Sequence, residues 1–459
     1  MQPSNTNILL MTDSYKVSHW KQYPAGTQRV FSFLESRGGK FPTTTFFGLQ
    51  HILKYLEGVV VTRAKIEEAA DFFHDHFNNP HLFNRVGWEH ILEYHGGRLP
   101  VEIKAIPEGT TVPTGNVLLT IENTDPFVPW LVNYLETLLV QVWYPTTVCT
   151  QSRHMKQFIK DAMVSTCDNL DGLPFKLHDF GYRGSTSVES AGIGGCAHLV
   201  NFMGTDTMAA LIEARDTYFT TMAGFSIPAA EHSTICAWGK EHEADAYRNM
   251  LEQYPTGLVA VVSDSYNIYD AVEEIWCKEL QEAVLTRSGT VVIRPDSGDP
   301  SKVIRSLLQT LGRSFGVTRN TKGYLVLNPK VRLIQGDGIT HDSLRHIIAD
   351  IISSGWSLDN ISFGSGGGLL QQLDRDTCRF AMKCSAVQID DVWHDVMKTP
   401  VGDEYKRSKP GRLILCDDGT GDYTTAREGH GTNLLRSVFS NGYMLNYDDL
   451  YTIRDRAAL

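Results

Sequence analysis

The sequence lacks the features of a membrane protein, a secreted disulfide-rich protein or a nucleic-acid-binding protein. No apolar run approaches the roughly 18 residues of a membrane span, and residues 1–16 lack the pattern of a signal peptide. The eight cysteines form no CxxC pair and no regular spacing, which predicts reduced, mostly buried thiols in a cytoplasmic protein. A formal net charge of -11 argues against a broad basic surface, but it leaves room for a local pocket that binds a small anion.

Several catalytic signatures are missing as well. The chain has no GxxxxGK[ST] stretch, which excludes a Walker-type nucleotide site, and neither HExxH nor GxSxG occurs. His74-Asp75-His76 has a spacing that metal sites use, but it lies on a polar helix face without a third ligand nearby. The sequence therefore indicates no metal ligands.

What the sequence does contain is one pattern used repeatedly: a short apolar run followed by glycine or charged residues. Its best example is Lys176–Gly184, in which an apolar start leads into Phe180, two glycines and Arg183. A buried parallel strand that delivers a ligand-contacting loop has this pattern. The pattern recurs with apolar runs at 199–202, 225–228, 259–262, 291–293, 331–334 and 361–363.

Helix-length segments separate these runs, so we predict an α/β fold. Its catalytic domain is a TIM-like (β/α) barrel over residues 146–389, with a possible eighth strand at 380–387. Residues 1–145 plus 390–459 would form a second, mixed α/β domain built from both chain ends. An open doubly wound sheet is the alternative to the barrel, and either one gathers the strand-end loops at the same end.

The gathered loops carry the residues of an anion-binding and catalytic site. Arginines and glycine-rich turns suit phosphate groups, although some of these charges could instead pair with each other. Glu231 and His232 follow one run, and Asp264 follows the next strand. A histidine held by a carboxylate can act as a base or a nucleophile, and a purely structural histidine is the alternative.

Six motifs within these loops carry a resemblance to a known family. They are residues 177–184, 204–206, 228–233, 293–298, 335–338 and 363–368. With Thr12–Lys16 near the start and the basic segment around Lys406, the whole chain resembles the nicotinamide phosphoribosyltransferases, type II of the nicotinate/nicotinamide phosphoribosyltransferase family.

The resemblance implies a reaction, its cofactors and an assembly. Ribose 5-phosphate would pass from phosphoribosyl pyrophosphate to nicotinamide, giving nicotinamide mononucleotide and pyrophosphate for NAD salvage. Mg²⁺ would help to neutralise the leaving pyrophosphate, and ATP hydrolysis would be coupled through a phosphorylated histidine. The enzyme would be a homodimer with both active sites at the subunit interface, with no nucleic-acid or membrane partner.

The resemblance also assigns roles to residues. Phe180 and Tyr15 of the partner subunit would enclose the pyridine ring, and Asp206 would accept a hydrogen bond from the substrate amide. His232 would be phosphorylated and Asp264 would orient it. Asp296 would complete the catalytic set, and further contacts would come from Arg183, Arg294, Gly336, Asp337, Gly366 and Gly367, and from Arg375, Lys383, Lys398 and Lys406 of the partner subunit.

Three rival interpretations remain open at this point. A nicotinate phosphoribosyltransferase would share the fold, but the carboxylate of Asp206 should repel an acid substrate. A sugar-phosphate aldolase or isomerase barrel would need a base or a Schiff-base lysine, and Lys176 is the lysine best placed within the strand-end motifs. A non-enzymatic binding role would not require Asp206, His232 and Arg294 together.

Overall fold

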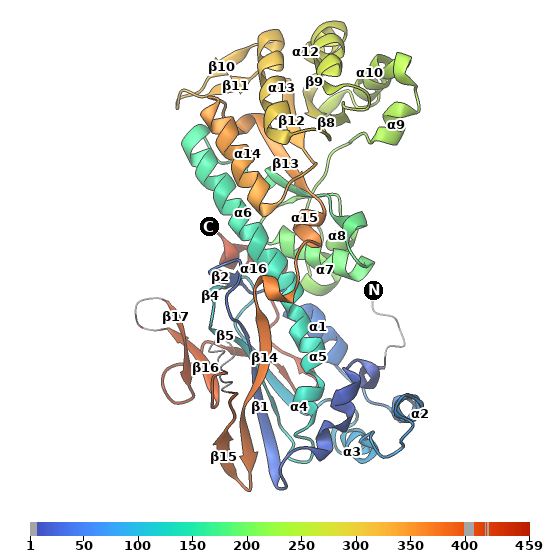
Figure 1. The fold of residues 1–459 in the computed structure, drawn as a ribbon, viewed down its shortest axis with the longest axis vertical. Helices are drawn as coiled ribbons and strands as arrows, with labels where there is room; N and C mark the ends of the chain where they lie inside the picture. Colours follow the sequence, from blue (N-terminus) through green and yellow to red (C-terminus); the bar gives the residue numbers. More distant parts are fainter. Residues whose placement is uncertain (1–6, 399–407, 418, 420–421) are drawn as a thin grey trace. The chain divides into compact units, whose positions relative to one another are not determined.

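The structure is a computed structural model that describes residues 7–398, 408–417, 419 and 422–459 (Figure 1). The chain divides into two compact units. Unit 1 comprises Met1–Thr150, Thr217–Thr220 and Leu373–Ala458, and unit 2 comprises Gln151–Asp216, Thr221–Gln372 and Leu459. The structure thus places the second division of the chain after 372, where the sequence indicated 389.

Unit 1 is built on a seven-stranded sheet of order β15-β14-β1-β5-β3-β18-β19. Every neighbouring pair in it is antiparallel. Figure 1 shows β1 in blue beside β14 in orange, so residues from the two ends of the chain share one sheet. The strands are β1 (Thr27–Ser36), β3 (Val101–Ala105), β5 (Val117–Asn123), β14 (Phe380–Ile389), β15 (Val392–Asp395), β18 (Arg436–Ser440) and β19 (Tyr443–Met444).

Unit 1 also contains helices and two small two-stranded sheets. Its hydrophobic core gathers fully buried aromatic side chains such as Phe33, Trp88 and Phe439. The small sheets pair β2 (Thr43–Thr45) with β4 (Thr111–Pro113) and β16 (Leu413–Asp417) with β17 (Tyr423–Arg427). The helices are α1 (Leu49–Leu56), α2 (Arg63–Phe77), α3 (Arg85–His95), α4 (Leu131–Tyr134), α5 (Glu136–Leu139) and α16 (Leu450–Ala457).

Unit 2 is built on a six-stranded parallel sheet of order β7-β6-β13-β12-β9-β8. The strands are β6 (Leu177–Asp179), β7 (Gly204–Thr205), β8 (Thr256–Val262), β9 (Ser288–Arg294), β12 (Val331–Gln335) and β13 (Ile361–Ser365). Their apolar middles are buried, as the central residues of parallel strands covered by helices should be. All carboxyl ends therefore lie at one edge.

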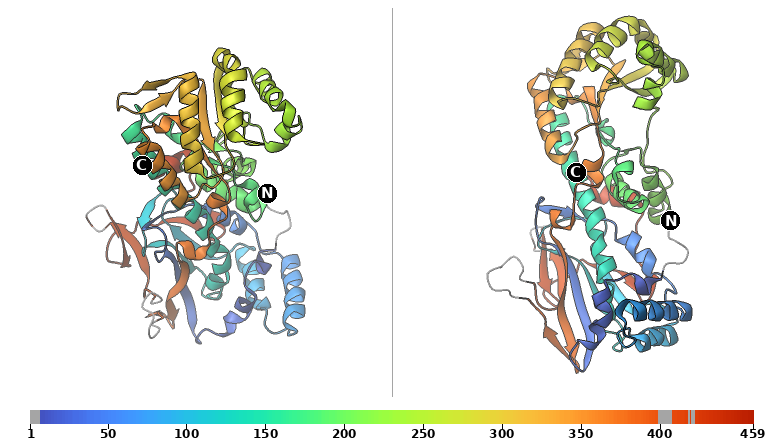
Figure 2. Two further views of the ribbon diagram at one scale, coloured as in Figure 1. Left: turned by 45° about the horizontal axis from the view of Figure 1, so that its top comes forward. Right: turned by 45° about the vertical axis from the view of Figure 1, so that its right-hand side comes forward.

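The helices of unit 2 follow the strands in the expected alternation (Figure 2). Helix α13 packs against both β12 and α14. The helices are α6 (Trp143–Thr166), which begins in unit 1, α7 (Val188–Leu199), α8 (Met208–Tyr218), α9 (His232–Cys236), α10 (Glu243–Gln253), α11 (Ile268–Asp270), η7 (Ala271–Glu279), α12 (Gln281–Thr286), α13 (Pro300–Phe315), α14 (His341–Ser353) and α15 (Gly367–Leu370). A hairpin pairs β10 (Val317–Arg319) with β11 (Leu325–Leu327). None of the helices in the described part of the chain combines the length and apolarity that crossing a bilayer demands.

The predicted eight-stranded barrel is only partly present. The sheet is a parallel half-barrel, and single bridges connect Gly204 with Phe225 and Ala229 with Ala260 at its two edges. The segment 225–229 thus spans both edges without forming a strand. The expected eighth strand, 380–387, is instead part of β14 in the antiparallel sheet of unit 1.

One predicted strand is a helix end. Leu199 is the last residue of α7 and 200–202 follow it, and the residues of α7 from Ala191 to Leu199 are all buried. A helix buried on every side has no polar stripe, so its end resembles a buried strand in sequence. The strand that precedes Asp206 is only Gly204–Thr205.

Candidate active site

A pocket of about 850 Å³ lies at the carboxyl ends of the unit 2 strands. Residues from β6, β7, β9, β12 and β13, or just after these strands, converge there, as parallel topology requires. The lining consists of Phe180, Tyr182, Arg183, Asp206, Thr207, Glu231, His232, Ser233, Arg294, Asp296, Gly336, Asp337 and Gly366. Most of the strand-end residues singled out in the sequence are therefore brought together, while Gly367 opens α15 next to the lining residue Gly366.

Phe180 has its position fixed by glycine backbone at the carboxyl ends of β12 and β13. Its backbone N–H donates to the carbonyl oxygen of Ser365 at 3.0 Å, which ties it to the end of β13. A Cβ on Gly364 would lie 2.0 Å from Cε2 of the Phe180 ring, and one on Gly336 would lie 3.4 Å from that atom. The ring therefore packs directly against glycine backbone, which leaves a half-buried aromatic surface at the pocket.

Arg294 and Asp296 form an ion pair at the pocket wall. Nη2 of Arg294 donates to Oδ2 of Asp296 at 3.0 Å. The Nε atom of Arg294 is buried and has no hydrogen-bond partner among the described residues. A buried donor without an acceptor is costly, so this guanidinium is suited to a ligand oxygen.

Asp206 is oriented by a residue that the sequence did not single out. The hydroxyl of Ser226 donates to Oδ1 of Asp206, and the Asp206 backbone N–H donates to Asp179 O at 3.0 Å. Asp206 is exposed and lines the pocket, so Ser226 holds one oxygen of a carboxylate that a ligand can reach. The motif 204–206 indicated Asp206 in the sequence, whereas Ser226 was not recognised because it lies inside the predicted apolar run 225–228.

The neighbouring Asp179 was also not predicted as a site residue. It is buried at the end of β6, and its Oδ1 accepts from the backbone N–H of Gly181 at 2.8 Å. Burial raises the pKa of Asp179 to about 6, and the charge of Asp206 adds to that increase.

His232 and Asp264 form the predicted histidine–carboxylate pair. Nε2 of His232 lies 2.9 Å from Oδ1 of Asp264. The histidine side chain is 46% exposed, whereas that of Asp264 is 4% exposed. An imidazole that donates through Nε2–H carries its lone pair on Nδ1, so the accessible ring has a fixed tautomer and a nucleophilic nitrogen.

A second pocket, of about 900 Å³, lies in unit 1 and collects basic residues. Its lining contains four of the residues expected to act across a dimer: Tyr15, Arg375, Lys383 and Lys398. Tyr15 is 60% exposed there. Burial lowers the pKa of Lys383 against the opposing effect of Glu136, and the nearby cations lower it further. Lys406, the fifth, lies outside the described residues.

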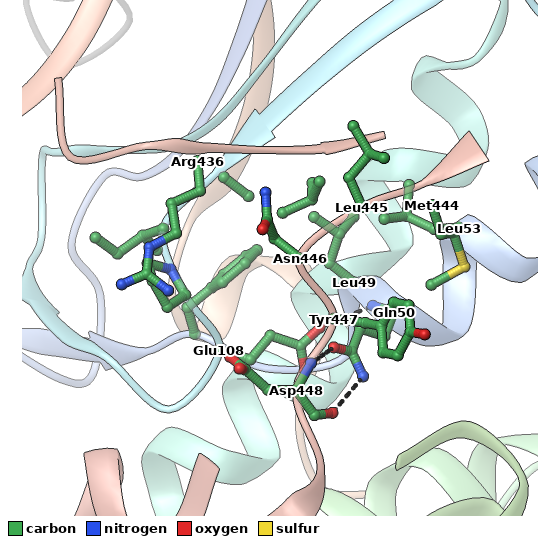
Figure 3. A pocket seen from close by; sticks show the side chains of 15 residues that line it. Leu49, Gln50, Leu53, Glu108, Arg436, Met444, Leu445, Asn446, Tyr447 and Asp448 are labelled. Atoms are coloured by element: carbon green, nitrogen blue, oxygen red, sulfur yellow. Dashed lines mark hydrogen bonds between the residues drawn. The ribbon is translucent and has the colours of Figure 1, made fainter. Parts of the chain in front are cut away.

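A third cavity, also in unit 1, is far smaller than the two pockets described above (Figure 3). Its volume of about 20 Å³ has room for roughly one water molecule. The buried Glu108 accepts from the N–H groups of Gly48 at 2.9 Å and Gln50 at 2.7 Å and from Tyr218 Oη at 3.0 Å. Burial raises the pKa of Glu108 to about 7. Its carboxylate oxygens already accept hydrogen bonds from backbone N–H groups at the start of α1.

Lys176 does not face the pocket at the strand ends. It precedes β6, and its Nζ donates to the carbonyl oxygens of Leu358 at 2.6 Å and Ile361 at 2.9 Å, at the start of β13. Burial lowers the pKa of Lys176 to about 8, but the amine is enclosed at the amino ends of the strands. Its position therefore gives no support to a Schiff-base aldolase.

Comparison with known proteins identifies the family of the chain. Residues 175–443, more than half of the chain, match the nicotinate phosphoribosyltransferase (NAPRTase) family. The chain belongs to this family. As a member of the nicotinate phosphoribosyltransferase family it is a pentosyltransferase, which confirms the resemblance drawn from its motifs. Residues 7–103 also match the N-terminal domain of nicotinamide phosphoribosyltransferase.

Curated relatives of this family member extend over nearly its whole length. A nicotinamide phosphoribosyltransferase of Xanthomonas campestris pv. campestris is 52% identical over 98% of both chains. One of Acinetobacter baylyi is 30% identical over 98% of this chain and 97% of its own, and one of Mycoplasma pneumoniae is 33% identical over 89% and 96%.

Solved structures with similar folds are more distant in sequence. Nicotinate-nucleotide pyrophosphorylase from Pyrococcus furiosus aligns with a TM-score of 0.61 at 15% identity, covering 100% of this chain and 96% of that one. Human nicotinic acid phosphoribosyltransferase aligns with a TM-score of 0.54 at 15% identity, covering 98% and 93%. These likenesses support the mixed α/β fold with its parallel half-barrel.

Proposed function

We propose that this phosphoribosyltransferase uses nicotinamide, converting it with phosphoribosyl pyrophosphate to nicotinamide mononucleotide and pyrophosphate in NAD salvage. The observation that carries the proposal is the oriented carboxylate of Asp206 in the pocket that also holds Phe180. The full-length relatives named nicotinamide phosphoribosyltransferases support the same substrate. We also propose a cytoplasmic location, in keeping with eight free cysteines.

The residues of the pocket suit the bond changes of this reaction. The pyridine nitrogen forms a bond to C1 of the ribose while the C1–oxygen bond to pyrophosphate breaks, and pyrophosphate leaves with the electron pair. Stacking on Phe180 would position the ring nitrogen, which needs orientation more than activation. Arg294 would bind a ligand oxygen, and Asp296 beside it would stabilise positive charge developing on the sugar.

The glycine turns and a second carboxylate complete the proposed phosphoribosyl site. Gly336 and Gly366 bring backbone close to the ligand, and Arg183 lines the same pocket. Asp337 and Asp296 offer the hard oxygen atoms that Mg²⁺ prefers beside phosphates, so these residues fit the ion. When bound, Mg²⁺ would supply charge neutralisation on the leaving pyrophosphate.

Asp206→Asn is expected to reduce the preference for nicotinamide over nicotinate by about 10- to 150-fold. A charge-assisted hydrogen bond to the substrate amide is worth roughly 1.5–3 kcal/mol, and an asparagine no longer repels a carboxylate. The ratio of kcat/KM for the two substrates measures the effect. Ser226→Ala keeps the charge of Asp206 and should change the ratio less. Equal use of both substrates by the unaltered protein would contradict the assignment.

We further propose that the active site is completed by a second copy of the chain. Phe180 and Asp206 line the pocket of unit 2, whereas Tyr15, Arg375 and Lys383 line the basic pocket of unit 1. In a homodimer, the basic pocket of one subunit would supply the second ring face and the phosphate ligands to the other subunit. Lys398 belongs to the same set.

Co-expressed Phe180→Ala and Tyr15→Ala chains should recover about a quarter of the unaltered activity, although each variant alone is nearly inactive. Random pairing makes half of the dimers mixed, and each mixed dimer has one intact site. Co-expressing Tyr15→Ala with Lys383→Ala is the matched control, because both changes lie in the same pocket and cannot complement. Failure of the first pair to recover activity would indicate that Tyr15 does not act across the dimer.

ATP is the remaining part of the proposal. We assign His232 as the residue that accepts the γ-phosphoryl group of ATP, with Asp264 holding the ring. The exposed side chain of His232 and its place in the lining of the unit 2 pocket support this assignment.

A further inference from the structure

Three potential metal ligands meet in unit 1, and none of them lines the pockets described above. They are His90 and His95 of α3 and Asp125, which follows β5. Oδ2 of Asp125 lies 2.7 Å from Nε2 of His90 and 2.6 Å from Nε2 of His95. All three ligand atoms lie within 4.8 Å of one another, and no second cluster of this kind occurs in the part of the chain that the structure describes.

The position of His90 is fixed by aromatic contacts. Its ring stacks on Phe127 with centroids 4.2 Å apart and on Tyr94 with centroids 4.5 Å apart. His95 is the last residue of α3, because Gly96 adopts the left-handed conformation that ends the helix. The negative end of the α3 dipole therefore lies at His95 and favours a bound cation there.

Asp125 is oriented just as firmly. Its Oδ1 accepts from the backbone N–H of Phe127 at 2.8 Å, and its carbonyl oxygen accepts from Asn123 Nδ2 at 2.7 Å. Burial raises the pKa of Asp125, but hydrogen bonds from His95, Phe127 and His90 outweigh it and lower the pKa overall. The carboxylate is thus ionised, and its second oxygen points at the two imidazoles.

Two imidazole nitrogens and one carboxylate oxygen are a ligand set that Zn²⁺ and related ions use with one position left for water. A tetrahedral site with bonds of about 2.0–2.1 Å separates neighbouring ligand atoms by about 3.4 Å, so each ring nitrogen needs to move away from Oδ2 of Asp125 by less than about 1 Å. The side chains are 17%, 27% and 15% exposed for His90, His95 and Asp125. Solvent can therefore reach the site and supply the fourth ligand.

We propose that His90, His95 and Asp125 bind one divalent transition-metal ion of the Zn²⁺ class. The ion links the end of α3 to the segment between β5 and α4, so its role is structural. It is separate from the hard-oxygen site that suits Mg²⁺ in the pocket of unit 2, and it does not depend on the proposed function.

The test is a Co²⁺ titration of the untagged, EDTA-treated full chain in the presence of millimolar Mg²⁺, followed by displacement with Zn²⁺. We expect visible d–d absorption that saturates at one equivalent per chain, and one retained zinc per chain after dialysis. His95→Gln should weaken Co²⁺ binding at least about tenfold while the glutamine still donates to Asp125. Zinc should raise the melting temperature of the unaltered chain but not that of His95→Gln.

His74→Gln is the matched control. His74 is exposed beside Asp75 at 3.2 Å on helix α2, and it should leave Co²⁺ binding unchanged. Phosphoribosyl transfer should be unchanged in both variants, so a failed metal titration and a failed function remain distinguishable. Absent or substoichiometric Co²⁺ absorption, or equal binding by the unaltered chain and a folded His95→Gln variant, would overturn the proposal.

Discussion

Gly364→Ala is expected to lower kcat/KM for nicotinamide by about 100-fold or more. The new Cβ would lie 2.0 Å from Cε2 and 2.2 Å from Cδ2 of the Phe180 ring, closer than any real contact. The strand backbone cannot retreat without breaking its pairing with β6, so the ring must leave its position. A displacement of about 1 Å in a substrate-positioning group can cost about 100-fold. Steady-state kinetics with varied nicotinamide measures the loss.

A control and a double variant separate the site effect from general damage. Gly172→Ala lies in the same unit, and its Cβ would meet nothing closer than Lys176 Cε at 3.6 Å, so activity should be retained. If Gly364 acts only through the ring, adding Gly364→Ala to Phe180→Ala should cause little further loss. Unchanged kinetics in a folded Gly364→Ala variant would show that Phe180 is not the platform for the pyridine ring.

The strand-end residues of unit 2 could be predicted because the chemistry follows the strands directly in sequence. Apolar runs followed by glycine or charged residues correctly predicted β6, β8, β9, β12 and β13. β14 was misassigned because its pairing with β1 joins residues more than 300 positions apart, and local pattern carries no information on that contact. The alternation of Phe380 and Met382 with Ala381 and Lys383 is the sequence signal of an antiparallel strand, and the burial in β14 alternates in part as well.

Contacts that depend on tertiary structure were not predictable. Ser226 reaches Asp206 from a segment without regular strand structure. The sequence pattern drew attention to His74–His76, but residues two apart on a helix do not face each other. The cluster that the structure shows draws instead on α3 and on Asp125, at least 30 positions away, and neither segment has a metal-binding spacing of its own.

His232→Ala is expected to retain basal transfer and to lose stimulation by ATP completely, so that the ratio of rates with and without ATP falls to about one. In the proposed step the γ-phosphoryl group leaves ADP, its bond to the bridging oxygen breaks, and a bond to Nδ1 of the imidazole forms. Nε2–H remains with Asp264 at 2.9 Å, which stabilises the positive charge on the ring. Initial rates at fixed phosphoribosyl pyrophosphate measure the ratio.

Asp264→Asn distinguishes a nucleophile from a merely structural histidine. The asparagine can still contact the ring but cannot stabilise its positive charge, so acid-labile label from γ-³²P-ATP should accumulate more slowly than in the unaltered chain and be absent in His232→Ala. Asp264 is almost fully buried, whereas His232 is open to solvent. The substitution of Asp264 therefore changes the charge next to the imidazole without changing the shape of the pocket. Equal ATP stimulation in His232→Ala and the unaltered chain would remove His232 from the energy-coupling step, leaving the pair a structural contact.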